Sequence, residues 1–245
     1  MSGGMDSSVL LHKAVQEYDK IYVLTFNYGQ RHFQELKCAN TQITYARRTG
    51  GCQIEHQVLD VTFIKELAPT SSLTNSDIDT PDVREVKGEA QPASYVPNRN
   101  MLFLSIAAAR AEAVGGADIW HGAAQADSLA GYWDGSPEFL ESINNVLGLN
   151  RENAVKIDAP LIELAKEDII KLGIKHNVKF KDTYTCYTGE DLPSVYSASS
   201  SLRIQGFIAA GYADPLLYKE QKELTEKYKE LGVKKIPYEN YAFKI

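Results

Sequence analysis

Near the start of the chain lies the stretch Ser2-Gly3-Gly4-Met5-Asp6-Ser7-Ser8, which runs directly into a predicted helix over residues 7–18. Paired glycines let the backbone turn tightly and come close to an anion. The N-terminus of a helix presents free N–H groups and a partial positive charge to that anion. Three serine hydroxyls add further donors. The stretch therefore predicts a phosphate-binding loop, the alternative being an ordinary helix cap, since Asp and Ser are common at helix starts.

Outward from this loop, short apolar runs alternate with helical patterns. We predict strands at residues 21–26, 55–61, 117–122 and 155–157, and further helices at residues 32–48, 101–114, 138–147, 166–177 and from 202 to 210. Such alternation is typical of a parallel sheet that is covered on both faces. The expected fold is α/β, with a doubly wound parallel sheet.

The segments between these elements differ in character. Residues 65–94 are rich in Ser, Thr, Asp and Pro and are expected to form a long mobile loop or lid, and residues 183–203 are expected to be loop-like. The last 25 residues, rich in Lys, Glu and Tyr, are expected at the surface. We expect a nucleotide-binding domain over residues 1–180 and a small appendage of loops and helices over 181–245.

Composition limits the classes of protein that this chain can be. Its 245 residues, 44% of them hydrophobic, suit a compact domain with a core large enough for an enzyme. A formal net charge of -6 disfavours a broad basic surface, so no direct nucleic-acid partner is expected. No apolar run approaches the roughly 20 residues that span a bilayer, and no signal peptide is visible. Three scattered cysteines form no disulfide framework, and the expected location is the cytoplasm.

The glycine stretch lacks the lysine of a Walker P-loop. It resembles the PP-loop group, the N-type ATP pyrophosphatases, which split ATP between its α and β phosphates. Further segments follow in order: Phe-Asn-Tyr-Gly-Gln-Arg-His at 26–32, Tyr-Val-Pro-Asn-Arg-Asn at 95–100, Gly-Tyr-Trp-Asp-Gly-Ser-Pro-Glu-Phe at 131–139, and Thr-Cys-Tyr at 185–187 ahead of Arg203 and Gly206-Phe207. With these, essentially the whole chain is similar to the QueC family of 7-cyano-7-deazaguanine synthases.

The resemblance implies a specific chemistry. ATP would activate the carboxylate of 7-carboxy-7-deazaguanine as an acyl adenylate, and ammonia would convert this to an amide. A second activation would remove the amide oxygen and leave the nitrile, a precursor of queuosine in tRNA. Adenylation is needed because a carboxylate does not expel oxide, and the glycine loop would stabilise charge on the departing phosphates. Mg²⁺ would neutralise the triphosphate. A homodimer is compatible with the sequence.

Candidate site residues follow from the motifs and from the resemblance. Asp6, Ser7 and Lys166 are expected in catalysis, and the ATP-binding set is Ser2, Gly3, Gly4, Asp6, Ser7 and Ser8. The substrate-binding set is Gln30, Arg31, His32, Arg99, Asn100, Asp127, Tyr132 and Asp134. The rings of Tyr132 and Trp133 suit stacking on a purine-like base, and a carboxylate can accept its N–H protons. Plainer alternatives are a helix start for Arg99 and Asn100, turns for the two aspartates, a solvated loop for residues 30–32, and an exposed lysine.

Two departures from the family pattern stand out. The family carries an apolar strand directly before Ser-Gly-Gly, whereas only Met1 precedes Ser2 here, so we expect the first strand to be missing and the natural reading frame to begin upstream. The family also has four zinc-binding cysteines near its C-terminus. This chain matches only Cys186, with Ser194, Ser197 and Ser200 at the other positions. Serine is a poor zinc ligand beside thiolates, so the structural zinc is expected to be lost.

Three alternative functions remain open at this point. The enzyme could stop at 7-amido-7-deazaguanine, and the product mass would show this. The chain could also be a degenerate nucleotide-binding protein without turnover, as the missing strand and cysteines suggest. A different PP-loop ligase, such as a tRNA thiolase, would be expected to carry a catalytic cysteine pair or an RNA-binding module. The nature of the product, the pathway served and the ammonia source are not encoded in any motif of the sequence.

Overall fold

The computed structural model describes residues 1–30, 33–75, 77–78, 93–116, 118–129, 132–150, 152–185 and 192–237. In chain order the larger elements are α1 (Met5–Glu17), β1 (Lys20–Asn27), α2 (Phe33–Thr49), β2 (Gln53–Asp60), α3 (Ile64–Leu67), α4 (Arg99–Val114), β3 (Asp118–Trp120), α5 (Gln125–Leu129), α6 (Pro137–Leu147), β4 (Lys156–Asp158), α7 (Lys166–Lys175), α8 (Ala198–Ala209) and α9 (Gln221–Glu230). Two short 3₁₀ turns, η1 (Trp133–Gly135) and η2 (Phe180–Asp182), complete the set.

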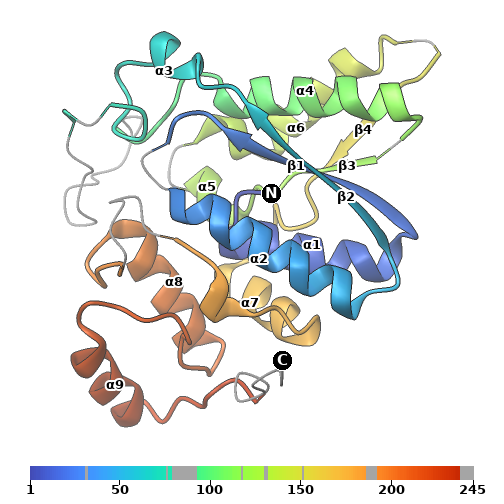
Figure 1. Cartoon of the computed structure of the whole chain (residues 1–245). Helices are drawn as coiled ribbons and strands as arrows, with labels where there is room; N and C mark the ends of the chain where they lie inside the picture. The colour runs from blue at the N-terminus through green and yellow to red at the C-terminus, as the bar shows by residue number, and fades with distance from the viewer. Residues whose placement is uncertain are drawn as a thin grey trace.

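The described strands form two separate parallel pairs. β1 pairs with β2 from Lys20 opposite Gln53 to Asn27 opposite Asp60, and β3 pairs with β4 over three residues. Figure 1 shows α1 and α2 on one side of the strands and α4 and α6 on the other. The α/β class with parallel strands is therefore confirmed, but these strands make two two-stranded sheets where we predicted one continuous sheet.

A gap between β1 and β3 accounts for this division. The amino group of Met1 lies on the open edge of β1 and donates a hydrogen bond to the carbonyl oxygen of Leu24. Beyond Met1, a cavity of about 890 Å³ extends between the two sheets and also reaches the glycine loop. Apolar side chains of α1 and α4, including Leu10 and Leu104, line the part between the strands. Met1 thus lies at this edge of β1, and β1 and β3 share no ladder among the described residues.

Helix α1 is held in place by two hydrophobic clusters. Val9 and Leu10 pack into one cluster with side chains of α7 and α8, such as Ile169 and Phe207. On the other side of α1, Leu11 and Val15 belong to a second cluster that contains residues of α2 and β1. Because a closely packed core resists small displacements, the N-terminus of α1 and the glycine loop before it have a fixed position.

The C-terminal part departs most from the prediction. Helix α8 begins at Ala198, inside the segment that we expected to be a loop, because the Ser197 hydroxyl caps it by accepting from the Ser200 N–H. The last 25 residues are not simply a surface tail. Leu224 and Tyr228 of α9 are buried, and Ile236 is 1% exposed. Burial of these apolar side chains outweighs the polar composition of the segment.

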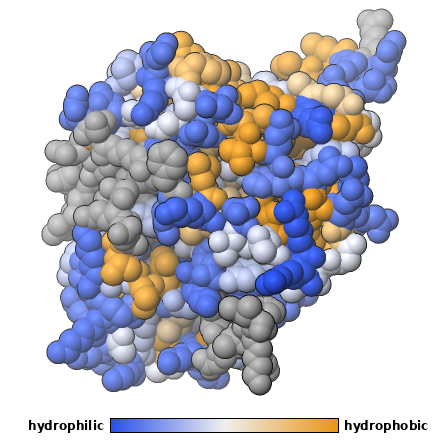
Figure 2. All heavy atoms as spheres, viewed as in Figure 1, coloured by the Kyte–Doolittle hydropathy of each residue, from blue (hydrophilic) through white to orange (hydrophobic). Residues whose placement is uncertain are grey.

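The predicted lid is described only at its two ends. Its first residues pack against the body of the protein: Ser71 and Ser72 are buried, and Leu73 is 2% exposed. Residues 76 and 79–92, which make up half of the predicted lid, lie outside the described residues. Figure 2 shows a mixture of hydrophilic and apolar patches on the face seen in Figure 1. Over the described ranges, every helix is too short or too polar to cross a membrane.

Candidate active site

The glycine loop adopts a conformation that depends on its glycines. Gly3 has a φ of 84°, in the left-handed region, and a Cβ atom there would lie 2.2 Å from the carbonyl oxygen of Glu35 on α2. Gly4 precedes α1 as its N-cap, and no side chain caps this helix. The carbonyl oxygen of Gly4 accepts from the Ser7 and Ser8 hydroxyls at 3.1 and 2.8 Å. The first N–H groups of α1 therefore have no side-chain acceptor and suit an anion.

The serines of the loop have different positions. The Ser2 hydroxyl lies 3.0 Å from that of Ser7, and both residues line the cavity together with Gly4 and Asp6. Ser8 is fully buried and directs its hydroxyl at Gly4. Gly3 packs against α2. Ser2 and Ser7 line the cavity, whereas Gly3 and Ser8 do not.

Asp6 and Lys166, which are 160 residues apart, form an ion pair. The Lys166 ammonium lies 3.1 Å from both carboxylate oxygens of Asp6. Asp6 stands in the first turn of α1 and not at its N-cap, so a capping role does not explain it. Lys166 is the first residue of α7, and its stem passes over Gly206 of α8, where a Cβ atom would come within 2.6 Å of it. The lysine is 18% exposed and is not the exposed first-turn lysine of the plainer alternative.

Helix α4 begins at the edge of the same cavity. Asn98, with a φ of 53°, turns the chain into the helix, and Arg99 and Asn100 form its first turn and line the cavity. The Arg99 guanidinium donates to the Tyr28 hydroxyl at 3.3 Å and lies over the Tyr28 ring. Arg99 and Asn100 therefore begin a helix, as the plainer alternative held, and they also place a cation and an amide at the cavity.

The two candidate aspartates are both buried, in different ways. Asp127 lines the cavity and accepts from the Ala124 N–H at 2.9 Å. Burial raises the pKa of its carboxyl, and the charge of Asp6 adds to the effect. Asp134 is 3% exposed, and its Oδ1 atom has no hydrogen-bond partner among the residues that the structure describes. Burial raises its pKa as well. Its neighbour Gly135 lines the cavity, but Asp134 itself does not.

Tyr132 and Trp133, the two candidate stacking residues, have different positions. Tyr132 lines the cavity, and its hydroxyl lies 2.7 Å from that of Ser94. Trp133 points elsewhere: its indole N–H donates to the Tyr95 hydroxyl, and its ring packs edge-on against Phe139. Tyr132 is thus the aromatic side chain of this pair that can reach a planar ligand in the cavity.

The Gln30 side chain is buried, which contradicts the solvated-loop alternative for this residue. Its Oε1 atom accepts from the Tyr28 N–H at 3.0 Å, and its amide donates to the Phe26 carbonyl at 3.4 Å. Gln30 therefore shapes the turn after β1 and lines the cavity from that position. The other two candidates of this segment, Arg31 and His32, lie outside the described residues.

The sequence analysis did not name several residues that line the cavity, among them Tyr28, Glu35 and His121. Burial raises the pKa of the Glu35 carboxyl to about 7, against the opposing effect of Arg99. Burial lowers the pKa of His121 to about 4, so its ring is neutral near neutral pH. Glu35 lies in the first turn of α2, and only the fold brings that turn against the glycine loop. In the sequence, the only sign that Glu35 belongs to the site was its place shortly after the motif at residues 26–32.

The carboxylates of the cavity suit Mg²⁺, whereas the serines of the C-terminal segment do not suit zinc. Asp6 and Asp127 place two carboxylates in one cavity, which suits Mg²⁺, an ion usually held by one or two carboxylates and by substrate phosphates. The serines at the family's zinc positions instead form hydrogen bonds. Ser197 donates to the Ser200 hydroxyl at 2.7 Å, and Ser194 donates to Glu220 at 3.1 Å. Hydroxyls engaged in this way do not fit zinc, and Cys186 lies outside the described residues.

Comparisons with known proteins agree on one family. The family described as "Queuosine biosynthesis protein QueC" matches residues 1–211. The 7-cyano-7-deazaguanine synthase of Oceanobacillus iheyensis is 40% identical over 89% of this chain and 96% of its own length. The enzyme of the same name from Thermoplasma volcanium is 35% identical over 93% of this chain and 92% of its own. The 7-cyano-7-deazaguanine synthase of Clostridium kluyveri is 38% identical over 91% of this chain and 97% of its own length. This chain therefore belongs to the QueC family of queuosine biosynthesis proteins.

Proposed function

We propose that this protein is an ATP-dependent ligase that converts 7-carboxy-7-deazaguanine and ammonia to 7-cyano-7-deazaguanine. The family and the names of the relatives support the reaction. The structural observation that carries the proposal is the meeting of two helix N-termini at one cavity. The start of α1, with Asp6 and its partner Lys166, and the start of α4, with Arg99, both face it. One suits phosphates and the other suits the substrate carboxylate.

The glycine loop binds the triphosphate. The N–H groups at the start of α1 and the Ser2 and Ser7 hydroxyls donate to the phosphate oxygens, and Lys166 supplies positive charge. The pyrophosphate leaves as the substrate oxygen attacks the α-phosphorus. Donors that are already in place stabilise the negative charge that develops on the leaving group. Asp6 keeps the lysine ammonium beside the loop in the absence of the nucleotide.

The two activations account for every atom of the product. First, a carboxylate oxygen of the substrate displaces pyrophosphate from ATP. Ammonia then attacks the acyl carbon, AMP departs, and a proton is lost to give the amide. In the second round the amide oxygen displaces pyrophosphate from another ATP. Loss of AMP and of both N–H protons leaves the carbon–nitrogen triple bond. Each nitrile therefore requires two ATP, whereas each amide requires one.

Asp6 and Asp127 would hold Mg²⁺, which supplies charge neutralisation to the triphosphate. Burial and the charge of Asp6 raise the pKa of Asp127, and a bound cation would favour the ionised form of Asp127. The Tyr132 ring is placed to stack on the deazaguanine.

The protein divides its work between two regions in this proposal. Residues 1–180 carry the nucleotide loop, and residues 181–245 support that loop from the side of α7. The C-terminal region does this without the family's zinc, since its serines already cap α8 and bind Glu220.

The decisive test of the function is a turnover assay. Purified protein, incubated with ATP, Mg²⁺, ammonium and 7-carboxy-7-deazaguanine, is expected to release AMP and pyrophosphate only when the carboxylate is present. Release of ADP and phosphate would contradict the proposal, as would the absence of turnover. Mass spectrometry identifies the product in the same sample. A nitrile with two AMP per molecule supports the full reaction, and an amide with one AMP shows that this enzyme stops at 7-amido-7-deazaguanine.

A further inference from the structure

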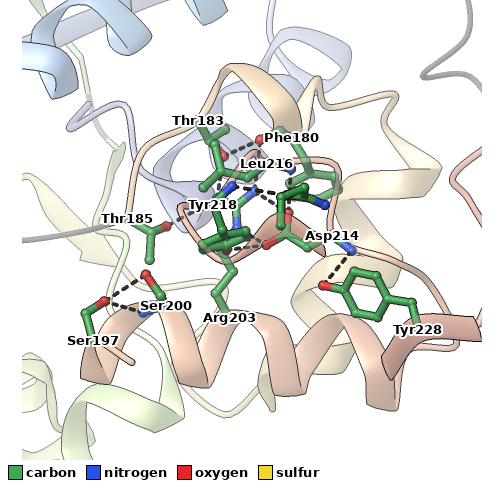
Figure 3. A network of polar contacts seen from close by, with 11 residues as sticks. Phe180, Thr183, Thr185, Ser197, Ser200, Arg203, Asp214, Leu216, Tyr218 and Tyr228 are labelled. Atoms are coloured by element: carbon green, nitrogen blue, oxygen red, sulfur yellow. Dashed lines mark hydrogen bonds and ion pairs between the residues drawn. The ribbon is translucent and has the colours of Figure 1, made fainter. Parts of the chain in front are cut away.

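A network of buried ionic and polar side chains lies at the junction of α8 with the C-terminal segment (Figure 3). The Arg203 side chain of α8 is 1% exposed and makes two hydrogen bonds to the carboxylate of Asp214, at 2.7 and 2.9 Å. Asp214 also accepts from the Tyr218 hydroxyl at 2.7 Å and donates its backbone N–H to the Tyr228 hydroxyl at 3.3 Å. The network thus ties α8 to α9.

The remaining donors of Arg203 are directed toward the segment that follows η2. The guanidinium donates to the hydroxyls of Thr183 and Thr185 at 2.6 and 3.2 Å, and to the Phe180 carbonyl at 2.9 Å. The Thr183 hydroxyl in turn donates to the same carbonyl at 2.7 Å. In Figure 3 the guanidinium lies between this segment and Asp214. A planar group with several fixed donors holds both sides at once, which an ammonium cannot do.

Tyr184, between the two threonines, is in direct contact with the glycine loop. Its backbone N–H donates to the carbonyl oxygen of Gly3 at 3.0 Å, and its own carbonyl oxygen lies 3.5 Å from where a Gly4 Cβ atom would be. On the opposite side Gly3 touches Glu35 and Ala39 of α2. The loop is therefore held between α2 and the segment that Arg203 fixes.

The charge of Arg203 is also within reach of the loop. Burial lowers the pKa of the guanidinium, but the charges of Asp214, Tyr218 and Asp6 raise it, and the net shift is upward. Arg203 therefore stays charged, and Asp6 of the nucleotide site is one of the groups that interact with it.

We propose that Arg203 and Thr183 are positioning residues for ATP: they hold the backbone of Tyr184 against Gly3 and so keep the loop in the shape that receives the phosphates. This inference rests on the proposed function, since it names what sets the geometry of the same site. Catalytic donors must be held within a fraction of an ångström, so a small shift of the loop weakens contacts to the phosphates.

Thr183, and not Arg203, is the residue to change. Removal of Arg203 would leave the buried Asp214 charge without a partner, and the protein could simply unfold. Thr183→Val keeps the shape of the side chain but removes the hydroxyl on the loop side of the network. Thr183→Ser restores the hydroxyl. Tyr228→Phe is the matched control, because it removes one hydrogen bond from the far side of the same network.

The readouts are KM for ATP, KM for the deazaguanine carboxylate, and Tm. Thr183→Val is expected to raise KM for ATP at least about fivefold and to leave KM for the carboxylate within about twofold, an effect on ground-state binding of one substrate. Thr183→Ser is expected to restore KM for ATP. Tyr228→Phe is expected to lower Tm with both KM values unchanged. Calorimetric titration with α,β-methylene ATP checks the same order of affinities without turnover.

The outcomes separate the two hypotheses. If the wild-type protein neither turns over nor binds the ATP analogue, the proposed function fails. If the wild-type protein is active but Thr183→Val and Tyr228→Phe lose Tm alike with the same KM for ATP, the network is only structural and the positioning inference is overturned. A rise in KM for the carboxylate equal to that for ATP would also overturn it, because the effect would then not be specific to the nucleotide loop.

Discussion

Lys166 reaches Asp6 because Gly206, on another helix, leaves room for its stem. A Cβ atom on Gly206 would lie 2.6 Å from the lysine side chain, so an alanine there would push the ammonium away from the loop. Gly3 has the same kind of role on the other side, where it lets the loop rest on α2. Because Gly206 and Gly3 have no Cβ atom, Lys166 and the glycine loop can come close together. Their separation determines how strongly the lysine would attract a phosphate bound at the loop.

Asp6 is expected to contribute to the rate. Replacement by alanine removes the partner of Lys166 and one of the two carboxylates that suit Mg²⁺, so we predict that Asp6→Ala lowers kcat at least about tenfold, or ~1.4 kcal/mol of transition-state stabilisation. Steady-state kinetics with saturating ATP measures this. Asp6→Asn keeps the size of the side chain and separates loss of charge from loss of packing. Wild-type kinetics in a folded Asp6→Ala protein would reduce Asp6 to a partner of the lysine.

Glu35 is expected to cost stability and to support activity. Burial raises its pKa in the folded protein to about 7, above the ordinary value of 4.5. Between these two values the folded state holds a proton that the unfolded chain has lost, so stability falls as pH rises through this window. Glu35→Gln avoids that loss. We predict a Tm above that of the wild type at pH 8 and a smaller difference at pH 5.

The same substitution is expected to lower kcat/KM at least about fivefold, because Glu35 lines the cavity and its carboxyl interacts with Arg99. Buried ionisable groups with shifted pKa values cluster at functional sites. Thermal melts at the two pH values and one activity assay are sufficient. A stability difference that is the same at pH 5 and pH 8 would exclude the ionisation of Glu35 as its cause. Full activity in the variant would make the carboxyl dispensable.

At the scale of the elements, prediction from the sequence succeeded where periodicity is strong. The limits of α1, β1, α4 and α6 were found to within two residues, because apolar runs and helical spacing reflect burial directly. It failed at α8, which starts four residues before Leu202. The reason is the run of serines, which suggests a loop by composition but here supplies the cap at Ser197. Composition alone does not distinguish a serine that caps a helix from a serine in a loop.

The same serines lead to a prediction about zinc. Ser197 and Ser200 bond to each other and cap α8, so the segment has hydroxyl contacts where thiolates would bind an ion. We predict that the protein binds no structural zinc, even after exposure to zinc and desalting. Elemental analysis measures the stoichiometry. The S194C/S197C/S200C variant, treated identically, is the control that should gain about one zinc per chain. One zinc per wild-type chain, lost on Cys186→Ala, would overturn the prediction.

At the scale of the whole molecule, the site could be assembled from the sequence only in part. Four residues of the glycine loop, Ser2, Gly4, Asp6 and Ser7, line one cavity with Arg99 and Asp127, and all six were named from the sequence. Glu35 and the Arg203 network were not, because their roles depend on contacts between segments far apart in the sequence. The division of the strands into two pairs was likewise not visible. Strand patterns give the number of strands but not their partners, and β3 and β4 are only three residues long.

The cavity between the two pairs leads to a last prediction. Met1 already lies on the edge of β1 as a strand residue would, with its amino group hydrogen-bonded to Leu24, and burial lowers the pKa of that group to about 6. An added segment such as Val-Ile-Val-Leu-Leu ahead of Met1 would replace this buried amino group by an amide N–H. It would also run beside Lys20–Leu24 and fill the space between β1 and β3.

Burial of one apolar side chain is worth roughly 1.5–3 kcal/mol, and 1 kcal/mol shifts Tm by about 2–4 °C in a chain of this size. We therefore expect the extended protein to melt at least about 4 °C above the 245-residue chain. The control is an extension of equal length with proline at its second and fourth positions, since proline cannot donate to a neighbouring strand. Differential scanning calorimetry compares the three proteins. An equal rise with both extensions would show that the cavity does not receive a strand, because then hydrogen bonding along β1 would contribute nothing to the gain.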